Sequence, residues 1–170
     1  AFAARALNCK AVICMPATTP ILKVEATRAY GAEVVLYGDS FDDAYAKSLE
    51  LQKKKGYVYI HPFNDQKVLA GQGTTALEII DELKDVDAIL VPIGGGGFAS
   101  GVALATKAVN PNVKVIGVEP EGAPCMEKSF MEGHVITLSA VDTVADGCAV
   151  KTPGDLTYAF CKKYLDQIKK

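Results

Sequence analysis

Four consecutive glycines follow directly after an apolar run in the stretch VPIGGGGFASG, and they are Gly94, Gly95, Gly96 and Gly97. Each glycine costs chain entropy and brings no side chain to pack, so a run of four needs a reason. The run is predicted to join a buried strand to a helix. At a helix start the backbone N–H groups are unpaired and the helix dipole is positive, and without side chains an anion can reach those groups. We therefore predict that this loop holds a phosphate or a carboxylate.

Other interpretations of the glycine run remain open on spacing alone. A tight turn packed against a neighbouring segment would explain one or two glycines better than four. The phosphate-binding loop of nucleotide triphosphatases needs Gly-Lys-Ser/Thr, whereas Phe98 and Ala99 follow here. A dinucleotide-binding fingerprint fits, because Gly94, Gly96 and Ala99 match G-x-G-x-x-A. Glu119 then stands 20 residues after Ala99, where a ribose-binding acid would lie.

Length, charge and composition exclude several classes of partner. The 170 residues allow one domain or two small ones. A formal net charge of -2 and a pI near 5.7 indicate no basic surface for nucleic acid. No apolar run reaches the roughly 18 residues of a membrane span, and no signal-peptide pattern opens the chain. We therefore expect a cytoplasmic location and neither a nucleic-acid nor a membrane partner.

Cysteine and histidine usage favours neither disulfides nor a metal centre. The cysteines are odd in number, none stands in a CxxC pair, and free thiols in a reducing cytosol are predicted. Only two histidines, His61 and His134, are present. We therefore predict no metal ligand among the residues of this chain.

Strand and helix periods alternate along the whole chain. Strands are predicted at 10–16, 32–38, 57–63, 87–94 and 114–120. Helices are predicted at 19–31, 40–55, 68–84, 98–109 and from 152 onward, with a short helix and an irregular stretch at 124–150. This alternation indicates βαβ units and an α/β fold with parallel sheets and flanking helices. The chain opens within a predicted helix and ends where a further strand is due, so we expect a part of a larger domain.

Several local expectations follow from residue types. Thr19 and Ser40 are predicted to cap helices. The 87–94 strand is predicted to be buried on both faces. Two apolar helix faces are predicted, one made of Phe98, Val102, Ala105 and Val109 and the other of Leu156, Phe160, Tyr164 and Ile168.

Five longer segments carry a resemblance to a known family. They are CMPATTPILKVEATRAYGAEVVLYG, HPFNDQKVLAGQGTTALEI, DAILVPIGGGGFASGVA, KVIGVEPEGA and ADGCAVKTPG, in this order. Together they resemble threonine dehydratase (threonine ammonia-lyase) in the β-family, or fold-type II, of pyridoxal-phosphate enzymes. That family also contains serine racemase and serine dehydratase. The resemblance covers essentially all of the chain.

The resemblance implies a tryptophan-synthase-β-like fold of two lobes, incomplete in this chain. Residues 1–62 would be part of the smaller lobe, and residues 63–170 part of the larger one that binds the cofactor phosphate. The run Gly94 to Gly97, with the N–H of Phe98, matches the loop that holds the phosphate of pyridoxal phosphate. Gly147, in ADG, matches a position beside the pyridine ring of the cofactor.

The implied reaction is β-elimination of threonine or serine, which gives a 2-keto acid and ammonia, as in isoleucine biosynthesis. The Schiff-base lysine of the family lies in a Ser-Phe-Lys stretch that this sequence lacks, so no catalytic residue is assigned and the chain alone is predicted to be inactive. A small amino-acid substrate and a homo-oligomer are also implied. The alternatives are an NAD-binding Rossmann-type module of a dehydrogenase and a non-catalytic assembly lobe.

Some polar residues have plainer interpretations. A cation site in serine racemase-like members matches Glu119 and the carbonyl of Ala123, but its third position is Cys125 here. A strand-end carboxylate that is capped or solvated is at least as good an interpretation of Glu119. His61 is expected to be hydrogen-bonded, and Gln72 to brace its helix against the glycine loop.

Overall fold

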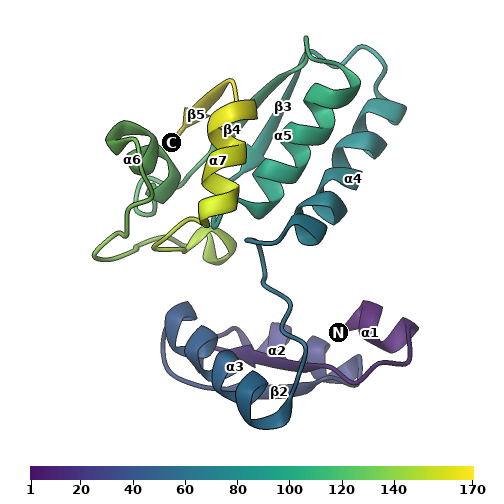
Figure 1. Cartoon of the computed structure of the whole chain (residues 1–170), viewed down its shortest axis with the longest axis vertical. Coiled ribbons are helices and arrows are strands. Elements are labelled where there is room, and N and C mark those ends of the chain that lie inside the picture. Colours follow the sequence, from purple (N-terminus) through teal and green to yellow (C-terminus); the bar gives the residue numbers. More distant parts are fainter. The chain divides into compact units, whose positions relative to one another are not determined.

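The computed structural model describes all residues from Ala1 to Lys170. The chain forms two compact units, Ala1–Tyr59 and Ile60–Lys170, which are described one at a time (Figure 1).

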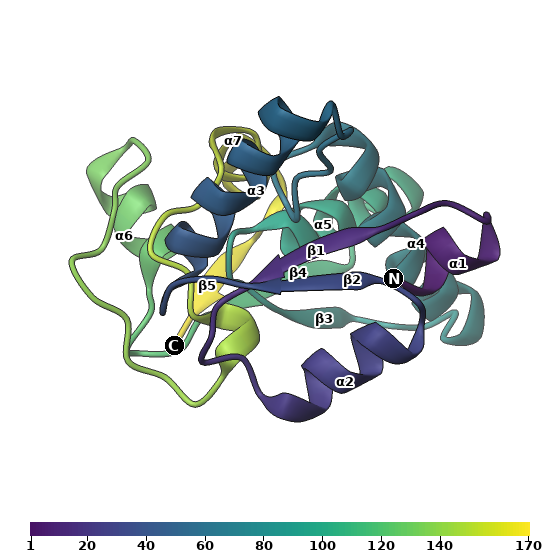
Figure 2. The same cartoon turned by 90° about the horizontal axis from the view of Figure 1, so that it is seen from below.

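The first unit is a two-stranded parallel sheet with helices on both faces. Strand β1 (Val12–Met15) pairs with β2 (Glu33–Leu36), and a short helix, α1 (Phe2–Ala6), precedes them. The connecting helix α2 (Ile21–Ala29) and the following helix α3 (Phe41–Lys55) lie on opposite faces of this sheet (Figure 2). The strand–helix–strand arrangement confirms a predicted βαβ unit.

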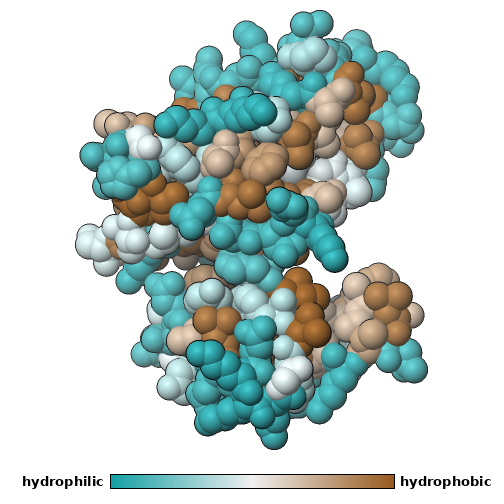
Figure 3. Space-filling view, in the orientation of Figure 1, coloured by the Kyte–Doolittle hydropathy of each residue, from teal (hydrophilic) through white to brown (hydrophobic).

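The caps of the two longer helices in this unit differ from one another. Ser40 forms the predicted cap of α3, because its hydroxyl accepts from the Asp43 N–H while the Asp43 carboxylate accepts from the Ser40 N–H. The predicted Thr19 cap of α2 is wrong. Pro20 occupies the N-cap position, and no side chain there accepts a helix N–H. The surface over the lysine-rich α3 is largely hydrophilic (Figure 3).

The predicted strand at 57–63 is absent. The segment has no ladder partner, and Val58 and Ile60 are 90% and 74% exposed. A strand needs a neighbour for its backbone groups, and β-branched composition alone cannot provide one. The chain instead turns at His61 and enters α4.

The second unit is a three-stranded parallel sheet with its large helices on one face. The strand order is β3 (Ala88–Pro92), β4 (Lys114–Val118), β5 (Gln167–Lys169). The helices are α4 (Gln66–Glu82), α5 (Gly97–Val109), α6 (Cys125–Glu132) and α7 (Asp155–Tyr164), with a 3-10 turn, η1, at Asp146–Cys148. Figure 1 shows α4, α5 and α7 side by side over the sheet.

This one-sided arrangement corrects two predictions. Strand β3 is not buried on both faces: Ile89 and Val91 lie in the core, whereas Leu90 between them is 68% exposed. The buried face of α5 centres on Val102, Ala103 and Thr106, and Val109 is exposed. Apolar composition indicates that a segment can be buried, but neighbouring elements decide which side is covered.

The last helix is shorter than predicted. It ends at Tyr164, and Ile168 lies in β5 opposite Gly117 of β4. Its fully buried residues are Thr157 and Cys161, whereas the predicted apolar stripe is only half-buried. Pairing with β5 satisfies the backbone groups along the edge of β4, which a continued helix would leave without a ladder partner.

None of the helices combines the length and the apolar character that a bilayer crossing requires.

Candidate functional site

The glycine run forms the junction between β3 and α5. Ile93, at the end of the strand segment, is fully buried, and its N–H donates to the carbonyl of Val118. Gly96 is the N-cap residue of α5 with a φ of 90°. This left-handed conformation is accessible to glycine and costly for other residues, so the sharp turn into α5 depends on it.

The backbone N–H groups of residues 94 to 98 have no acceptor within the chain. The first hydrogen bond of the α5 start runs from the Ser100 N–H to the Gly96 carbonyl, at 2.8 Å. Gly95, Gly96 and Gly97 are nevertheless buried. Unpaired buried N–H groups at a helix N-terminus attract an anion, both by hydrogen bonding and through the helix dipole.

The carbonyl groups of the same loop are all paired. The Gly94 oxygen accepts from the Cys125 thiol at 3.6 Å, and the Gly96 oxygen accepts from the Cys161 thiol at 3.8 Å. The Gly95 oxygen accepts from the Thr157 hydroxyl at 2.6 Å. The Gly94 and Gly95 carbonyls therefore point toward α6 and α7, the Gly96 carbonyl is shared between Ser100 of α5 and Cys161, and the loop donors remain available.

Close packing also requires glycine at these positions. A β-carbon on Gly95 would lie 2.5 Å from ring carbons of Phe63, and one on Gly97 would lie 2.8 Å from the Phe63 α-carbon. A β-carbon on Gly96 would lie 2.6 Å from the Met126 methyl carbon. Two explanations of the glycine run, close packing against a neighbour and N–H groups left available for an anion, thus apply to the same residues.

Gly147 lies against the first glycine of the run. A β-carbon on Gly94 would lie 2.7 Å from the Gly147 carbonyl oxygen and 3.2 Å from the Cys148 α-carbon. A β-carbon on Gly147 itself would meet nothing within 4 Å. The fold thus brings together the two motifs that sequence analysis singled out, and it leaves open space beside Gly147.

Three residues of this site were not identified from the sequence. Phe63 covers the glycine run, the Asn64 side-chain oxygen accepts from the Leu156 N–H at 3.0 Å, and Thr157 binds the Gly95 carbonyl. No local pattern marks them, because their partners stand between 32 and 92 positions away in the chain. Only the HPFND stretch gives a hint, since proline, asparagine and aspartate close together favour a turn.

His61 organises the turn that carries Phe63 and Asn64. Its Nδ1 accepts from the Phe63 N–H at 3.2 Å and from the Asn64 N–H at 2.8 Å, as expected of a hydrogen-bonded histidine. Burial lowers the pKa of His61, and the nearby Asp65 charge opposes this effect. An Nδ1 that accepts two N–H bonds must be unprotonated, so the turn requires neutral histidine.

Glu119 is a buried cap of α6. It is 1% exposed, and its two carboxylate oxygens accept from the Met126 and Glu127 N–H groups, each at 2.8 Å. Burial raises the pKa of Glu119, and these two hydrogen bonds partly offset the effect. The capped-carboxylate interpretation is therefore confirmed, whereas the dinucleotide interpretation needed this carboxylate for a ribose and is not favoured.

Cys125, at the start of α6, lies beside Glu119 and the Gly94 carbonyl. Burial, with the neighbouring Glu119 charge, raises the pKa of Cys125 to about 12, so this thiol keeps its proton and can donate it. The Gln72 β-carbon lies 2.8 Å from where a β-carbon on Gly101 of α5 would stand, so Gln72 packs against the helix that follows the glycine loop. That it braces the loop itself stays a prediction.

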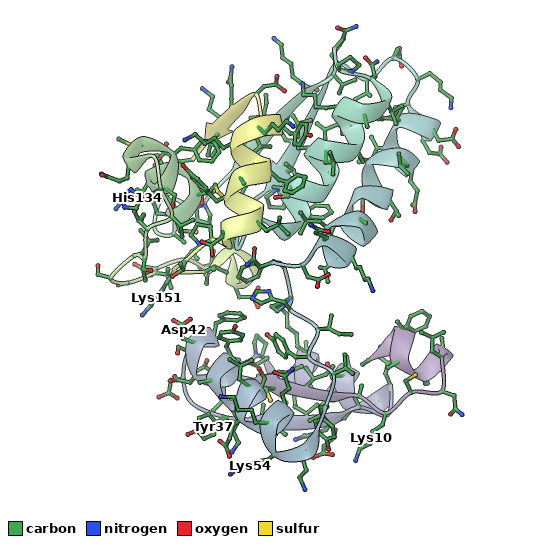
Figure 4. The ribbon with its side chains drawn as sticks, in the orientation of Figure 1. Lys10, Tyr37, Asp42, Lys54, His134 and Lys151 are labelled. Atoms are coloured by element: carbon green, nitrogen blue, oxygen red, sulfur yellow. The ribbon has the colours of Figure 1, made fainter.

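Two lysines of the first unit project into solvent. Lys10 and Lys54, labelled in Figure 4, have side chains that are 72% and 67% exposed. Neither lies in a buried site.

Comparisons with known proteins agree with this geometry. The family model described as "Pyridoxal-phosphate dependent enzyme" matches residues 1–169. An L-threonine ammonia-lyase of Thermotoga maritima is 49% identical over 168 residues, which cover 99% of this chain and 42% of that protein. The processed form of threonine deaminase isoform 2 from Solanum lycopersicum superimposes with a TM-score of 0.92 at 49% identity, over 99% of this chain and 47% of that one. Maize serine racemase gives a TM-score of 0.92 at 37% identity, over 98% and 50%.

The chain belongs to the family of pyridoxal-phosphate-dependent enzymes. It spans less than half the length of the ammonia-lyase that it matches. The resemblance to threonine dehydratase and the α/β fold with parallel sheets are thereby confirmed. The unpaired N–H groups of residues 94 to 98 also fit a phosphorylated cofactor, because they offer several donors to one anion.

Proposed function

We propose that this chain is the phosphate-binding part of a pyridoxal-phosphate-dependent ammonia-lyase that converts threonine or serine to a 2-keto acid and ammonia. The observation that carries the proposal is the buried glycine loop, whose carbonyls are paired within the protein and whose N–H groups are not. Relatives over the full length of the chain supply the reaction class.

Each site residue has a definite role in this proposal. Gly94, Gly95, Gly96 and Gly97, with the N–H of Phe98, hold the cofactor phosphate at the positive end of α5. Gly147 would lie beside the pyridine ring, as the resemblance implies, and the open space at its α-carbon leaves room for that ring. The bound cofactor supplies an electron sink that acidifies the α-hydrogen of the amino acid. We assign the Schiff-base lysine to no residue of this chain, because none stands in a matching motif.

We propose threonine as the preferred substrate of the enzyme. The Thermotoga maritima relative is named an L-threonine ammonia-lyase and the tomato structure a threonine deaminase, at 49% identity each. Serine is the second candidate, because a serine racemase shares the fold at 37% identity. Both substrates carry the β-hydroxyl that the reaction eliminates.

Binding of pyridoxine 5′-phosphate to the 170-residue chain tests the phosphate site. This compound lacks the aldehyde and so cannot react with surface lysines. We expect it to shift the amide NMR signals of residues 94 to 98, and we expect excess NADH not to displace it. Pyridoxine without the phosphate is the matched control. The proposal fails if the two compounds have equal effects, or if the shifted amides lie elsewhere.

A keto-acid assay tests the reaction class. The protein encoded by the complete reading frame, loaded with pyridoxal phosphate, is expected to release 2-oxobutanoate from threonine and pyruvate from serine. The 170-residue chain is expected to release neither. Turnover by the chain alone would contradict the lysine assignment, and no turnover by the complete protein would contradict the reaction class.

Three further proposals rest on the resemblance. Residues 1–62 belong to the smaller lobe and 63–170 to the larger, with the compact units dividing at Tyr59. The complete protein is a homo-oligomer in the cytoplasm. Light scattering of the complete protein checks the assembly, and a mass equal to one chain would contradict it.

A further inference from the structure

Three consecutive carbonyls of the glycine loop each accept a hydrogen bond from a side chain. The Gly95 oxygen also accepts from the Gly154 N–H at 3.3 Å, and the Gly96 oxygen from the Ser100 N–H at 2.8 Å. Cys125 at the start of α6 binds the Gly94 oxygen, while Thr157 and Cys161, one turn apart on α7, bind the Gly95 and Gly96 oxygens. All three side chains belong to fully buried residues. Such a row of donors along a loop backbone restricts the rotation of each peptide plane.

The direction of these carbonyls determines the direction of the loop N–H groups. In a trans peptide the C=O of one residue and the N–H of the next point in opposite directions. Because the Gly95 carbonyl turns toward α7, the Gly96 N–H turns away from it. The same relation applies to the Gly94 carbonyl with the Gly95 N–H, and to the Gly96 carbonyl with the Gly97 N–H.

From this geometry we infer that Thr157 is the main positioning residue of the phosphate site, with Cys125 and Cys161 in supporting roles. The inference rests on the proposed phosphate-binding function. Thr157 does not touch the phosphate; it orients the Gly96 N–H toward it by holding the Gly95 carbonyl. A threonine hydroxyl is a stronger donor than a thiol, and its 2.6 Å bond is the shortest of the three.

The surroundings of Thr157 restrict its hydroxyl to this role. Its oxygen accepts from the Gly154 N–H at 3.0 Å, which fixes the side chain at the start of α7. The hydroxyl has one proton, and the Gly95 oxygen at 2.6 Å is nearer than the Gly154 oxygen at 3.1 Å. The same oxygen would lie 2.8 Å from a β-carbon on Gly96, so it also restricts that position to glycine.

Substitution of Thr157 in the 170-residue chain tests the inference. Thr157→Val keeps the shape and removes the hydroxyl, and Thr157→Ser keeps the hydroxyl. The matched control is Thr106→Val, because Thr106 on α5 is equally buried and its hydroxyl has no partner. Each variant is titrated with pyridoxine 5′-phosphate and with inorganic phosphate, and its fold is checked by circular dichroism and urea unfolding.

We expect T157V to bind both probes about tenfold more weakly, the loss of roughly one hydrogen bond. T157S is expected to bind within about twofold of the unsubstituted chain, as is T106V. In the ligand-free T157V chain the Gly96 amide signal is expected to move, which a loss of global stability alone would not cause. Equal affinity of T157V and the unsubstituted chain would overturn the inference, as would a T157S variant as weak as T157V.

Two outcomes separate this inference from the proposed function. If the unsubstituted chain binds neither probe at residues 94 to 98, the phosphate site itself is refuted. If it binds and T157V does not fold, Thr157→Cys decides, because it keeps a donor on the same residue but a weaker one. T157C is expected to bind about threefold more weakly, and unchanged affinity would overturn the inference.

Discussion

The ring of Phe63 occupies the space that a β-carbon on Gly95 would need, with three ring carbons 2.5 to 2.6 Å from that position. The same residue restricts Gly97 through its backbone, because its α-carbon and carbonyl oxygen would lie 2.8 and 3.0 Å from a β-carbon there. Phe63 thus requires glycine at two loop positions. Its ring, which a substitution can remove, excludes a β-carbon at Gly95, and its main chain, which a substitution cannot remove, excludes one at Gly97.

This difference predicts a selective rescue. Gly95→Ala and Gly97→Ala are each expected to lower the free energy of unfolding by about 1–3 kcal/mol through overpacking. In a Phe63→Ala background the cost of G95A should fall, whereas the cost of G97A should persist. Urea unfolding of the four chains and their parents measures these costs. Equal rescue of both glycine variants would contradict the assigned contacts.

Two helix glycines are predicted to respond in opposite directions. A β-carbon on Gly101 of α5 would collide with the Leu69 carbonyl and come 2.8 Å from the Gly73 nitrogen, so Gly101→Ala should destabilise by about 1–3 kcal/mol. Gly71 of α4 has no neighbour within 4 Å of its β-position, and Gly71→Ala should stabilise by about 0.5–1 kcal/mol. Thermal unfolding compares the two. A stabilising G101A would show that α4 and α5 lie further apart.

Acid is predicted to weaken the turn at His61. Because burial lowers its pKa in the folded chain, the unfolded chain takes up this proton first as the pH falls. Stability from this group is complete above its ordinary pKa of about 6.5 and is lost as the pH falls from there through the folded value. His61→Asn keeps an acceptor for the turn without titrating there. Urea unfolding from pH 8 to pH 5 should show a smaller acid loss in H61N, and an unchanged loss would contradict the prediction.

Loss of one acceptor at Glu119 is predicted to weaken the start of α6. In Glu119→Gln an amide nitrogen replaces a carboxylate oxygen and faces a backbone N–H, so a buried donor loses its partner. The expected loss is about 1–3 kcal/mol in the free energy of unfolding. Glu127→Gln is the control, because that carboxylate pairs with Lys170 near the surface, where such pairs contribute about 0–1 kcal/mol. A larger effect for E127Q than for E119Q would contradict this assignment.

Prediction from the sequence succeeded where the cause is local. The Ser40 cap depends on residues within four positions, and the parallel sheets follow from the alternation of strand and helix periods. It failed where a distant partner decides. Residues 57–63 have strand composition and no neighbouring strand, and Ile168 has helical spacing yet pairs with Gly117 of β4.

The amino-acid sequence by itself determined that a glycine loop with available N–H groups stands between a strand and a helix, because backbone freedom and helix polarity are properties of the local chain. Only the tertiary structure decided which way those N–H groups point. The carbonyls that orient them are held by Cys125, Thr157 and Cys161, which stand 31, 62 and 65 positions further along the chain. No local pattern records a hydrogen bond that forms only when α6 and α7 pack against the end of β3.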